Sequence, residues 1–205
     1  DQFILKDKSY YRVANFSKGL MQDGVTSYFH QSIGGYHAAK LGRYQELYDY
    51  QISKNNVQVL NMLNTKYFIF PDKEGKLQVQ QNSDNNGNVW FVDEIKKVNS
   101  ANEEIQALDS LNTKTTAILN MHNFGAQFKA DAKPDFEKDS TATIQLISNS
   151  LNKLTYQSNT SKKQFAVFSE IYYKDGWNAY IDGKLIPHYQ VNYVLRGLVV
   201  PVGNH

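Results

Sequence analysis

Residues 164–181 read QFAVFSEIYYKDGWNAYI, and this stretch shows most clearly how the chain folds. Residues 164–172 are rich in β-branched and aromatic side chains, which strands favour. Gly176 marks a tight turn, and residues 177–181 supply the next strand-like run. Because no apolar repeat of helical spacing interrupts the stretch, it predicts two successive strands.

The surrounding C-terminal region has the same character. Short strand-like runs alternate with glycine-containing turns, and no helical pattern lies between them. The runs are residues 141–148, 153–157, 185–189 and 198–200. Many short strands at this spacing are typical of an antiparallel β-sandwich, which we expect over residues 141–205.

The N-terminal region instead mixes helical and strand patterns. Leu41, Tyr44, Leu47 and Tyr48 recur at helical spacing and predict a helix over residues 38–51. Other patterns predict strands at 10–16 and 66–70, a helix at 56–63, a β-meander at 72–98 with an Asn86-Gly87 hairpin turn, and a helix capped by Ser100 and Glu103. We therefore expect an α+β chain, with a mixed α/β part over 1–127, a charged connection over 128–140, and the sandwich after it.

The composition excludes several classes of protein. The 205 residues are 41% hydrophobic and 20% charged, as in globular domains, and a net charge of +2 without a dense basic patch argues against nucleic acid as a partner. The absence of cysteine excludes disulfides, thiolate zinc sites and cysteine nucleophiles. A content of 14 Tyr suits half-exposed β surfaces and surfaces that contact sugars.

The chain contains no apolar run long enough to cross a bilayer. It begins with Asp1 and Gln2 and shows no signal-peptide pattern. We therefore expect either that a leader has been removed or that the chain is a piece of a longer protein.

Motifs for metal binding and covalent catalysis are absent. No two of the five histidines are three or four positions apart, so we expect neither a metal site nor another cofactor. The chain lacks Gly-x-Ser-x-Gly, the phosphate-binding P-loop and the dinucleotide fingerprint. Two distant carboxylates could still form a glycosidase pair, but acidic residues such as Asp131, Asp135 and Glu137 fall in a stretch that we interpret as a charged surface loop. We predict no catalytic residue.

One candidate binding segment lies around a double glycine. Gly34 and Gly35 precede the helix expected from residue 38, and backbone amides at a helix start favour anions. The candidate ligand-binding residues are Tyr36, His37, Lys40, Arg43 and Tyr44. Their aromatic faces suit a sugar ring, and their cations suit phosphate or a lipid headgroup. The alternative, which we favour, is a loop-to-helix joint with a solvated basic face.

Trp177 is the second candidate. It follows a strand end and a tight turn, where an exposed ring could stack on a sugar. A tryptophan in this position more often closes the end of a sandwich core, and both interpretations stay open.

Three blocks of the sequence resemble the extracytoplasmic region of YfhO-family bacterial membrane proteins. They are SIGGYHAAKL at 32–41 with RYQ at 43–45, LNMLNTKYFI at 60–69, and the C-terminal series FSEIYY at 168–173, GW at 176–177, YIDG at 180–183, NY at 192–193, RG at 196–197 and PVGNH at 201–205. The Gly-Gly-Tyr-His form is most similar to versions from Bacteroides-type bacteria. The middle of the chain, roughly 72–165, matches only in general character.

The resemblance implies a role in cell-envelope glycosylation. YfhO-like proteins are multi-pass membrane proteins similar to GT-C glycosyltransferases, which transfer a sugar from a polyprenyl-phosphate carrier to an acceptor outside the cytoplasmic membrane. The family's acidic catalytic residue lies between early membrane helices that this chain lacks, so no catalytic residue is carried over. The family also continues past the PVGNH block with another strand, so the sandwich here is expected to leave one edge unpaired.

The leading hypothesis is therefore a non-catalytic accessory domain on the periplasmic face of the cytoplasmic membrane. Its expected partners are the membrane portion of its own parent chain and a polyprenyl-phosphate sugar or glycan acceptor. Two alternatives remain: a carbohydrate-binding module, and a structural or partner-docking domain without a ligand.

Overall fold

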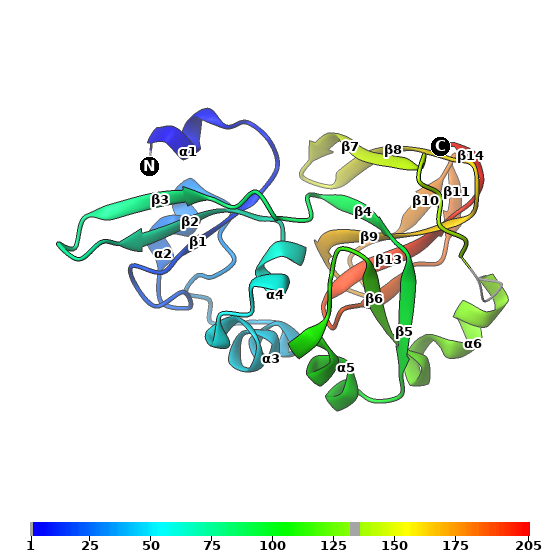
Figure 1. The fold of residues 1–205 in the computed structure, drawn as a ribbon, viewed down its shortest axis with the longest axis horizontal. Coiled ribbons are helices and arrows are strands. Elements are labelled where there is room, and N and C mark those ends of the chain that lie inside the picture. Colours follow the sequence, from blue (N-terminus) through cyan, green and yellow to red (C-terminus); the bar gives the residue numbers. More distant parts are fainter. Residues whose placement is uncertain (1, 132–135) are drawn as a thin grey trace.

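Helices and strands alternate along the N-terminal half of the computed structural model, which describes residues 2–131 and 136–205. Among the described residues after 136 there are strands but no helix. The predicted α+β class is confirmed. Figure 1 shows two lobes side by side, with β1–β3 in one and the larger sheet in the other.

The N-terminal lobe is built on a three-stranded sheet. Its order is β1 (Arg12–Asn15), β2 (Thr65–Pro71) and β3 (Leu77–Gln81), with β1 and β2 parallel and β2 and β3 antiparallel. The helical elements of this lobe are α1 (Gln2–Lys6), α2 (Gly24–Phe29), α3 (Gly42–Tyr50), the 3-10 turn η1 (Ile52–Lys54) and α4 (Val57–Met62). The segment from α2 to α4 makes the long crossover that two parallel strands require.

The second lobe is built on a six-stranded sheet in the order β4-β9-β13-β12-β6-β5. Its strands are β4 (Val89–Val92), β5 (Glu94–Val98), β6 (Thr116–Asn120), β9 (Gln164–Ile171), β12 (Tyr189–Val191) and β13 (Leu195–Val200). The helical elements α5 (Ala101–Ala107), η2 (Leu108–Ser110) and α6 (Met121–Asp131) accompany it. Only β5 and β6 pair in parallel among these six.

This sheet takes strands from both sides of the expected connection at 128–140. β4, β5 and β6 precede that stretch, and β9, β12 and β13 follow it. The two expected parts, 1–127 and 141–205, therefore share one sheet. Residues 132–135 of the connection lie outside the described residues, and α6 extends to Asp131, where we had expected irregular backbone from residue 128.

A smaller sheet packs on one face of the larger one. It consists of β14 (Gly203–Asn204), β8 (Lys153–Thr160) and β7 (Thr143–Ser150), all antiparallel. Ile144 and Tyr156 from this sheet pack against Ala166, Phe168 and Val200 of the larger sheet. The two layers are thus not a sandwich built from residues 141–205 alone, because strands before residue 128 complete the larger layer.

The expected β-meander at 72–98 is wrong. β3 pairs with β2 and β4 pairs with β9, so the two strands flanking Asn86-Gly87 belong to different sheets. Asn86 is buried: its backbone N donates to Asn61 O at 3.0 Å, and its side chain donates to Thr113 at 3.1 Å. These contacts fix the segment as a connection between lobes, which the local turn signal does not reveal.

The main hydrophobic core is continuous between the lobes. It includes Leu47 and Leu63 from the first lobe and Leu119, Phe165 and Leu195 from the second, each fully buried. Burying one such side chain contributes about 1.5–3 kcal/mol. The shared core therefore joins the lobes into one folding unit.

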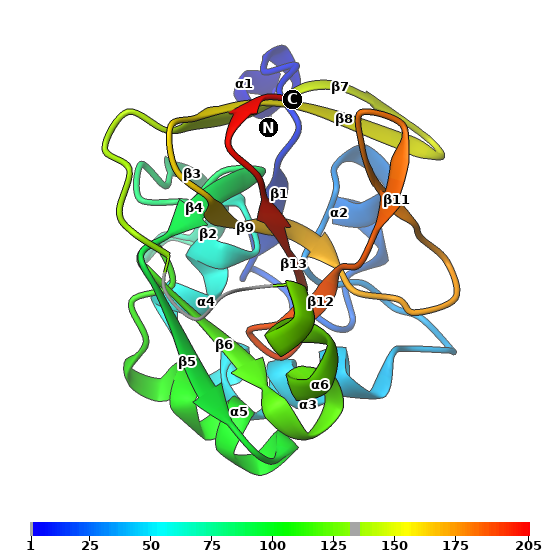
Figure 2. The ribbon, with the colours of Figure 1, turned by 90° about the vertical axis from the view of Figure 1, so that its right-hand side faces the viewer.

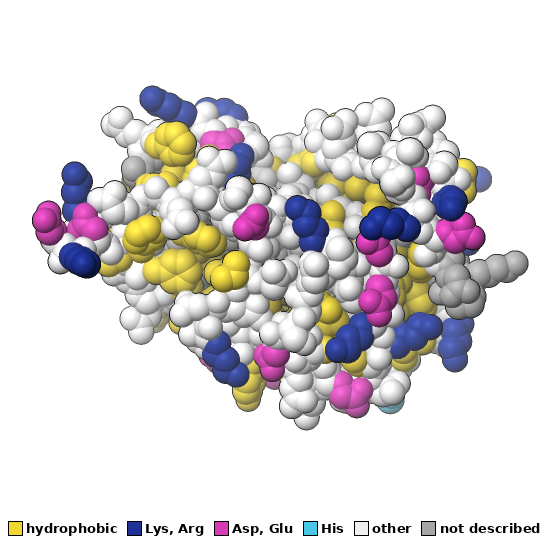
Figure 3. All heavy atoms as spheres, viewed as in Figure 1, with side chains coloured by type: hydrophobic (Ala, Val, Ile, Leu, Met, Phe, Trp, Pro, Cys, Tyr) yellow, Lys and Arg dark blue, Asp and Glu magenta, His cyan; other side chains and the backbone are white. Residues whose placement is uncertain are grey.

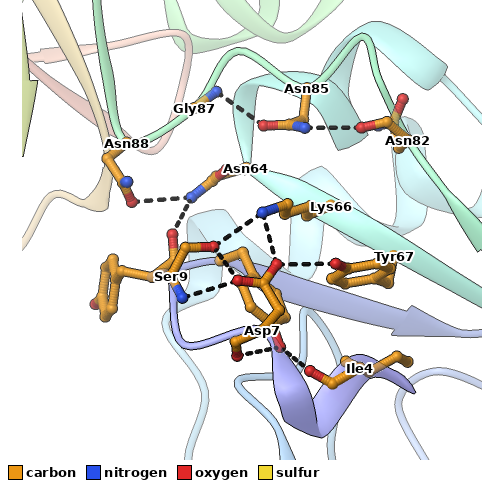
Figure 4. A network of polar contacts seen from close by, with 12 residues as sticks. Ile4, Asp7, Ser9, Asn64, Lys66, Tyr67, Asn82, Asn85, Gly87 and Asn88 are labelled. Carbon is orange, nitrogen blue, oxygen red and sulfur yellow. Dashed lines mark hydrogen bonds and ion pairs between the residues drawn. The ribbon is translucent and has the colours of Figure 1, made fainter. Parts of the chain in front are cut away.

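A polar network ties the N-terminal segment to β2 (Figure 4). Asp7 accepts hydrogen bonds from Lys66 at 2.6 Å, from Tyr67 at 2.8 Å and from both the backbone and the hydroxyl of Ser9. Asn64 donates to Tyr10 O at 2.9 Å and thereby bonds to the same segment. Because the Asp7 carboxylate accepts hydrogen bonds from two residues of β2, this polar network fixes the loop after α1 against the sheet.

Candidate functional site

One face of the six-stranded sheet changes from apolar to charged along β9 and β13. Alternate residues of a strand share a face, so Glu170 follows Ala166 and Phe168 on β9. On β13, Arg196 precedes Leu198 and Val200 on the same face, and because β13 runs antiparallel to β9 both charged residues lie at the same end. The β7–β8 sheet covers the apolar part. At the charged end lies a cavity of about 730 Å³, lined by both charged side chains.

A free-standing hairpin forms another wall of this cavity. β10 (Ala179–Ile181) and β11 (Lys184–Ile186) pair with each other and with no other strand among the described residues. Figure 2 shows the hairpin beside the sheet, with β7 and β8 crossing above. Its turn uses Asp182 and Gly183 at φ of 50° and 78°, a left-handed pair typical of tight hairpins.

Arg196 is fixed at the inner wall. Its Nε and Nη2 both donate to Ile171 O, at 3.0 and 2.7 Å, and its guanidinium carbon lies 4.5 Å from the centre of the Trp177 ring. Burial lowers the pKa of Arg196, and the nearby Glu170 carboxylate opposes that shift. An arginine remains charged at neutral pH even so, and the cavity therefore holds a positioned cation.

Glu170 lies on the neighbouring strand and is held by Arg12. Arg12 Nη2 is 3.6 Å from Glu170 Oε1, and both side chains are about one-eighth exposed, at 13% and 12%. Arg12 Nη1 also donates to Leu63 O and Ser169 O, which fixes its position. The Glu170 carboxylate is consequently oriented before any ligand arrives.

Two neutral polar side chains complete the lining. Burial, and next the Glu170 charge, raise the pKa of Tyr156 well above its ordinary value, so its hydroxyl keeps its proton. Burial, and next the Arg196 charge, lower the pKa of His188, so its imidazole is neutral at pH 7. His188 Nε2 is buried and has no hydrogen-bond partner among the described residues.

Trp177, predicted as a candidate, lies in this cavity. It is half-buried, and none of the hydrophobic clusters formed by the described residues includes it. Its ring is covered by the Arg196 guanidinium on one side.

Arg43 and Tyr44, two other candidates, connect parts of the fold. Arg43 Nη1 donates to Glu104 at 2.9 Å and to Tyr193 O at 3.1 Å, and its guanidinium carbon lies 4.5 Å from the Tyr193 ring centre. The Tyr44 hydroxyl donates to Ile33 O, and burial raises the pKa of Tyr44 to about 12. Both residues therefore belong to a joint between parts of the fold, although Arg43 is paired internally and is not part of the solvated basic face that we had expected.

The remaining candidates Tyr36, His37 and Lys40 are exposed and precede the helix, because α3 begins at Gly42 and not at residue 38. Residues 36–40 bury no apolar surface that would hold them in a helix. The cavity beside Trp177 includes none of the five residues predicted from this segment.

The double glycine has a structural explanation. Gly35 N donates to Leu20 O at 2.8 Å, and a Cβ built on Gly34 would lie 2.0 Å from the same oxygen. The glycines thus allow a close approach between two backbone segments, where we had considered an approach to a ligand.

Sequence reasoning did not bring Glu170, Arg196 and His188 together. The alternation on β9 and β13 is a usable signal, because Glu170 ends a face that contains Ala166 and Phe168, and Arg196 shares a face with Leu198 and Val200. What the sequence does not show is that β9 and β13 are neighbours and that their charged ends coincide.

Searches against protein-family models, curated proteins and solved structures found no match to this chain. No helix in the described part of the chain is long and apolar enough to cross a membrane. Within residues 2–131 and 136–205, no group of three His, Asp or Glu side chains could hold a metal ion. The chemistry of the cavity is therefore the main guide to function.

Proposed function

We propose that this chain binds a saccharide in the cavity beside Trp177, as an extracytoplasmic accessory domain of a multi-pass membrane glycosyltransferase-like protein. The observation that carries the binding proposal is the arrangement of Trp177, Arg196 and Glu170 around one 730 Å³ cavity. The sequence blocks that resemble YfhO-family proteins support the membrane context.

A sugar ring needs two kinds of contact. Its C–H face packs on aromatic rings, and its hydroxyls bond to side chains fixed in position. The cavity offers both kinds, since the Trp177 and Tyr180 rings line it together with the oriented Glu170 carboxylate. Its volume lies within the usual range of roughly 300–1,000 Å³ for small-ligand sites, enough for one or two sugar units.

The proposed role is acceptor binding and not catalysis. The acidic catalytic residue of the family that the chain resembles belongs to the membrane portion of the parent protein. In this arrangement the domain would hold a glycan acceptor, or the sugar of a polyprenyl-phosphate donor, near the periplasmic end of that membrane portion. The isolated chain is then expected to bind sugars without turning them over.

Titration of the purified chain with a panel of mono- and disaccharides tests the proposal. Binding is followed by isothermal titration calorimetry, because Trp177→Ala removes one of the only two tryptophans and would abolish a fluorescence signal whether or not a sugar binds. Trp177→Ala should weaken binding at least about tenfold by loss of ring contact. Tyr50→Ala is the matched control, because Tyr50 on α3 is 55% exposed and outside the cavity.

A saccharide that binds the wild type and Tyr50→Ala equally, but Trp177→Ala weakly, supports the proposal. If no saccharide in the panel binds, the alternative of a ligand-free structural domain stands instead. Sugar turnover by the purified chain, abolished by one substitution, would contradict the non-catalytic role.

A further inference from the structure

The charges that line the cavity are unequally partnered. Glu170 has Arg12 nearby, and Asp182 Oδ2 lies 2.7 Å from Nδ1 of His205. Arg196, in contrast, makes no ion pair with any described residue, and its side chain hydrogen-bonds only to a backbone carbonyl. Lys153 adds a further cation to the lining. Arg196 is thus the half-buried cation of this cavity whose charge no described acid meets at ion-pair distance.

The geometry of Arg196 leaves one edge of its guanidinium unused. A guanidinium has five N–H groups in a plane. The edge formed by Nε–H and one Nη2–H donates to Ile171 O, and the ring of Trp177 covers one face of the plane. The other edge, made of Nη1–H and the second Nη2–H, has no acceptor among the described residues. Two parallel donors of this kind match the two oxygens of a carboxylate.

Neighbouring groups offer further hydrogen bonds at the same wall. The Tyr156 hydroxyl is protonated and lines the cavity, and no hydrogen bond joins it to another described residue. Nε2 of His188 also lacks a partner in the described part of the chain. An apolar ligand would leave the buried Nε2 of His188 without a hydrogen-bond partner, which is unfavourable for a buried polar atom.

We propose that the saccharide bound in this cavity is acidic, with its carboxylate on the free edge of Arg196 and its ring against Trp177 and Tyr180. This inference rests on the proposed function. A uronic acid, in which the C6 hydroxymethyl of a hexose is replaced by a carboxylate, has this chemistry.

Charge favours a carboxylate over a phosphate ester. A phosphate monoester carries close to two negative charges at pH 7. The cavity has a single fixed guanidinium, and the Glu170 carboxylate lies close enough to affect its pKa. A second negative charge would face Glu170 without a second fixed cation, whereas a carboxylate is neutralised by Arg196 alone.

Matched sugars that differ only at C6 provide the test. The purified chain is titrated with glucose, glucuronate and glucose 6-phosphate, and with the corresponding galactose and mannose series, by chemical-shift perturbation. In at least one series the uronate should bind about tenfold or more tighter than the neutral sugar, as charge-assisted bidentate bonds require. The 6-phosphate should bind more weakly than the uronate.

Two variants assign the effect to the guanidinium. Arg196→Gln should reduce uronate affinity to that of the neutral sugar and leave the neutral sugar's affinity within about threefold, since only the charge-assisted contact is lost. Lys97→Gln is the matched control, because it removes an exposed cation on β5, outside the cavity, and should change affinity less than threefold. If Arg196→Gln fails to fold, salt provides the measurement. Raising NaCl from 50 to 500 mM should weaken only uronate binding in the wild type, because salt screens its charge-assisted contact.

The outcomes separate the two proposals. If neutral sugars bind as tightly as uronates in every series, the acidic inference is wrong and the proposed function stands. If the 6-phosphate binds tightest, the carboxylate preference is wrong. If no sugar binds at all, both proposals are overturned.

Discussion

Two arginines of this protein stack on aromatic rings at the same distance and have opposite surroundings. The guanidinium carbon of Arg43 lies 4.5 Å from the Tyr193 ring centre, and that of Arg196 lies 4.5 Å from the Trp177 ring centre. Arg43 donates to the buried Glu104 carboxylate, whereas Arg196 donates only to a backbone carbonyl and lines a cavity. The stack itself therefore does not separate a structural arginine from a candidate binding arginine.

The hydrogen-bond acceptor of each guanidinium makes the difference between the two arginines. Glu104 is fully buried, accepts from Arg43 and also accepts from Tyr193 N at 3.0 Å. That second bond holds the turn between β12 and β13, where Asn192 and Tyr193 both have positive φ. Such backbone conformations are costly for residues with side chains and persist only where surrounding contacts fix them. The charge of Arg43 is thus fully used within the fold, while that of Arg196 is not.

Lys66 is a third cation on aromatic rings and lies between these two extremes. Its Nζ is 5.5 Å from the Tyr11 ring centre and bonds to Asp7, as Figure 4 shows. The Asp7 side chain is 18% exposed, against 1% for Glu104. If burial of the acid determines how much each ion pair stabilises the fold, removing the Glu104 carboxylate should lower the free energy of unfolding more than removing the Asp7 carboxylate.

The largest effect is expected from Glu104→Ala. The substitution leaves the Arg43 charge and the Tyr193 amide without their buried acceptor, and it should lower the free energy of unfolding by about 3 kcal/mol. Urea denaturation followed by circular dichroism measures the loss. Glu74→Gln, an exposed change in the turn before β3, is the control and should stay within about 0.5 kcal/mol. Equal stability of Glu104→Ala and the wild type would show that Arg43 is not a structural arginine.

An intermediate effect is expected from Asp7→Asn. Hydrogen bonds from Lys66, Ser9 and Tyr67 outweigh the opposing effect of burial and hold the pKa of Asp7 well below its ordinary value of 3.8. The ionised carboxylate therefore stabilises the folded state above pH 3.8, and this contribution is lost as the pH falls toward the lowered value. The variant should be about 1 kcal/mol less stable at pH 7, with a difference that shrinks below pH 4.

Urea midpoints between pH 2.5 and 7 measure this dependence. Asp84→Asn serves as the control, since Asp84 is exposed and its carboxylate has no partner in the described part of the chain. A stability difference for Asp7→Asn that does not change with pH would mean that the Asp7 side chain acts through its shape and hydrogen bonds and not through its charge.

Local features of the fold were predictable from the sequence. The Ser100 side chain accepts from Glu103 N, as the capping pattern indicates, although the Glu103 carboxylate bonds to Asn99 N and not to Ser100 N. The strands at 164–171 and 65–71 match the predicted runs closely. The pairing of strands was not predictable. β4 and β9, for example, are paired although they lie about 75 residues apart, and neither segment carries a local signal for its partner.

The candidate site divides in the same way. Trp177 could be singled out because a lone tryptophan after a turn is visible in the sequence. The role of Arg196 depends on which side chains line the cavity with it, and the sequence does not show these neighbours. Arg43 shows the converse: the double glycine and nearby cations made it a candidate for ligand binding, but Glu104, 61 positions away in the sequence, accepts a hydrogen bond from its guanidinium. A charged residue's role is set by its partner, which local sequence does not identify.

The smallest effect is expected from Tyr36→Ala, which tests the predicted segment directly. Tyr36 is 78% exposed and lies on the irregular stretch before α3. Figure 3 shows one face of the molecule, where exposed hydrophobic side chains gather on the lobe that contains β1–β3, so an exposed ring is not exceptional there. A side chain with so little burial should change the free energy of unfolding by less than about 0.5 kcal/mol when it is truncated.

Saccharide affinity should also be unchanged in Tyr36→Ala, because Tyr36 is not part of the cavity. Parallel titrations of Tyr36→Ala and Trp177→Ala decide between the two regions. Weaker binding only in Trp177→Ala places the ligand in the cavity at Arg196. Weaker binding only in Tyr36→Ala would place the binding surface at the segment after Gly34 and Gly35, together with Arg43.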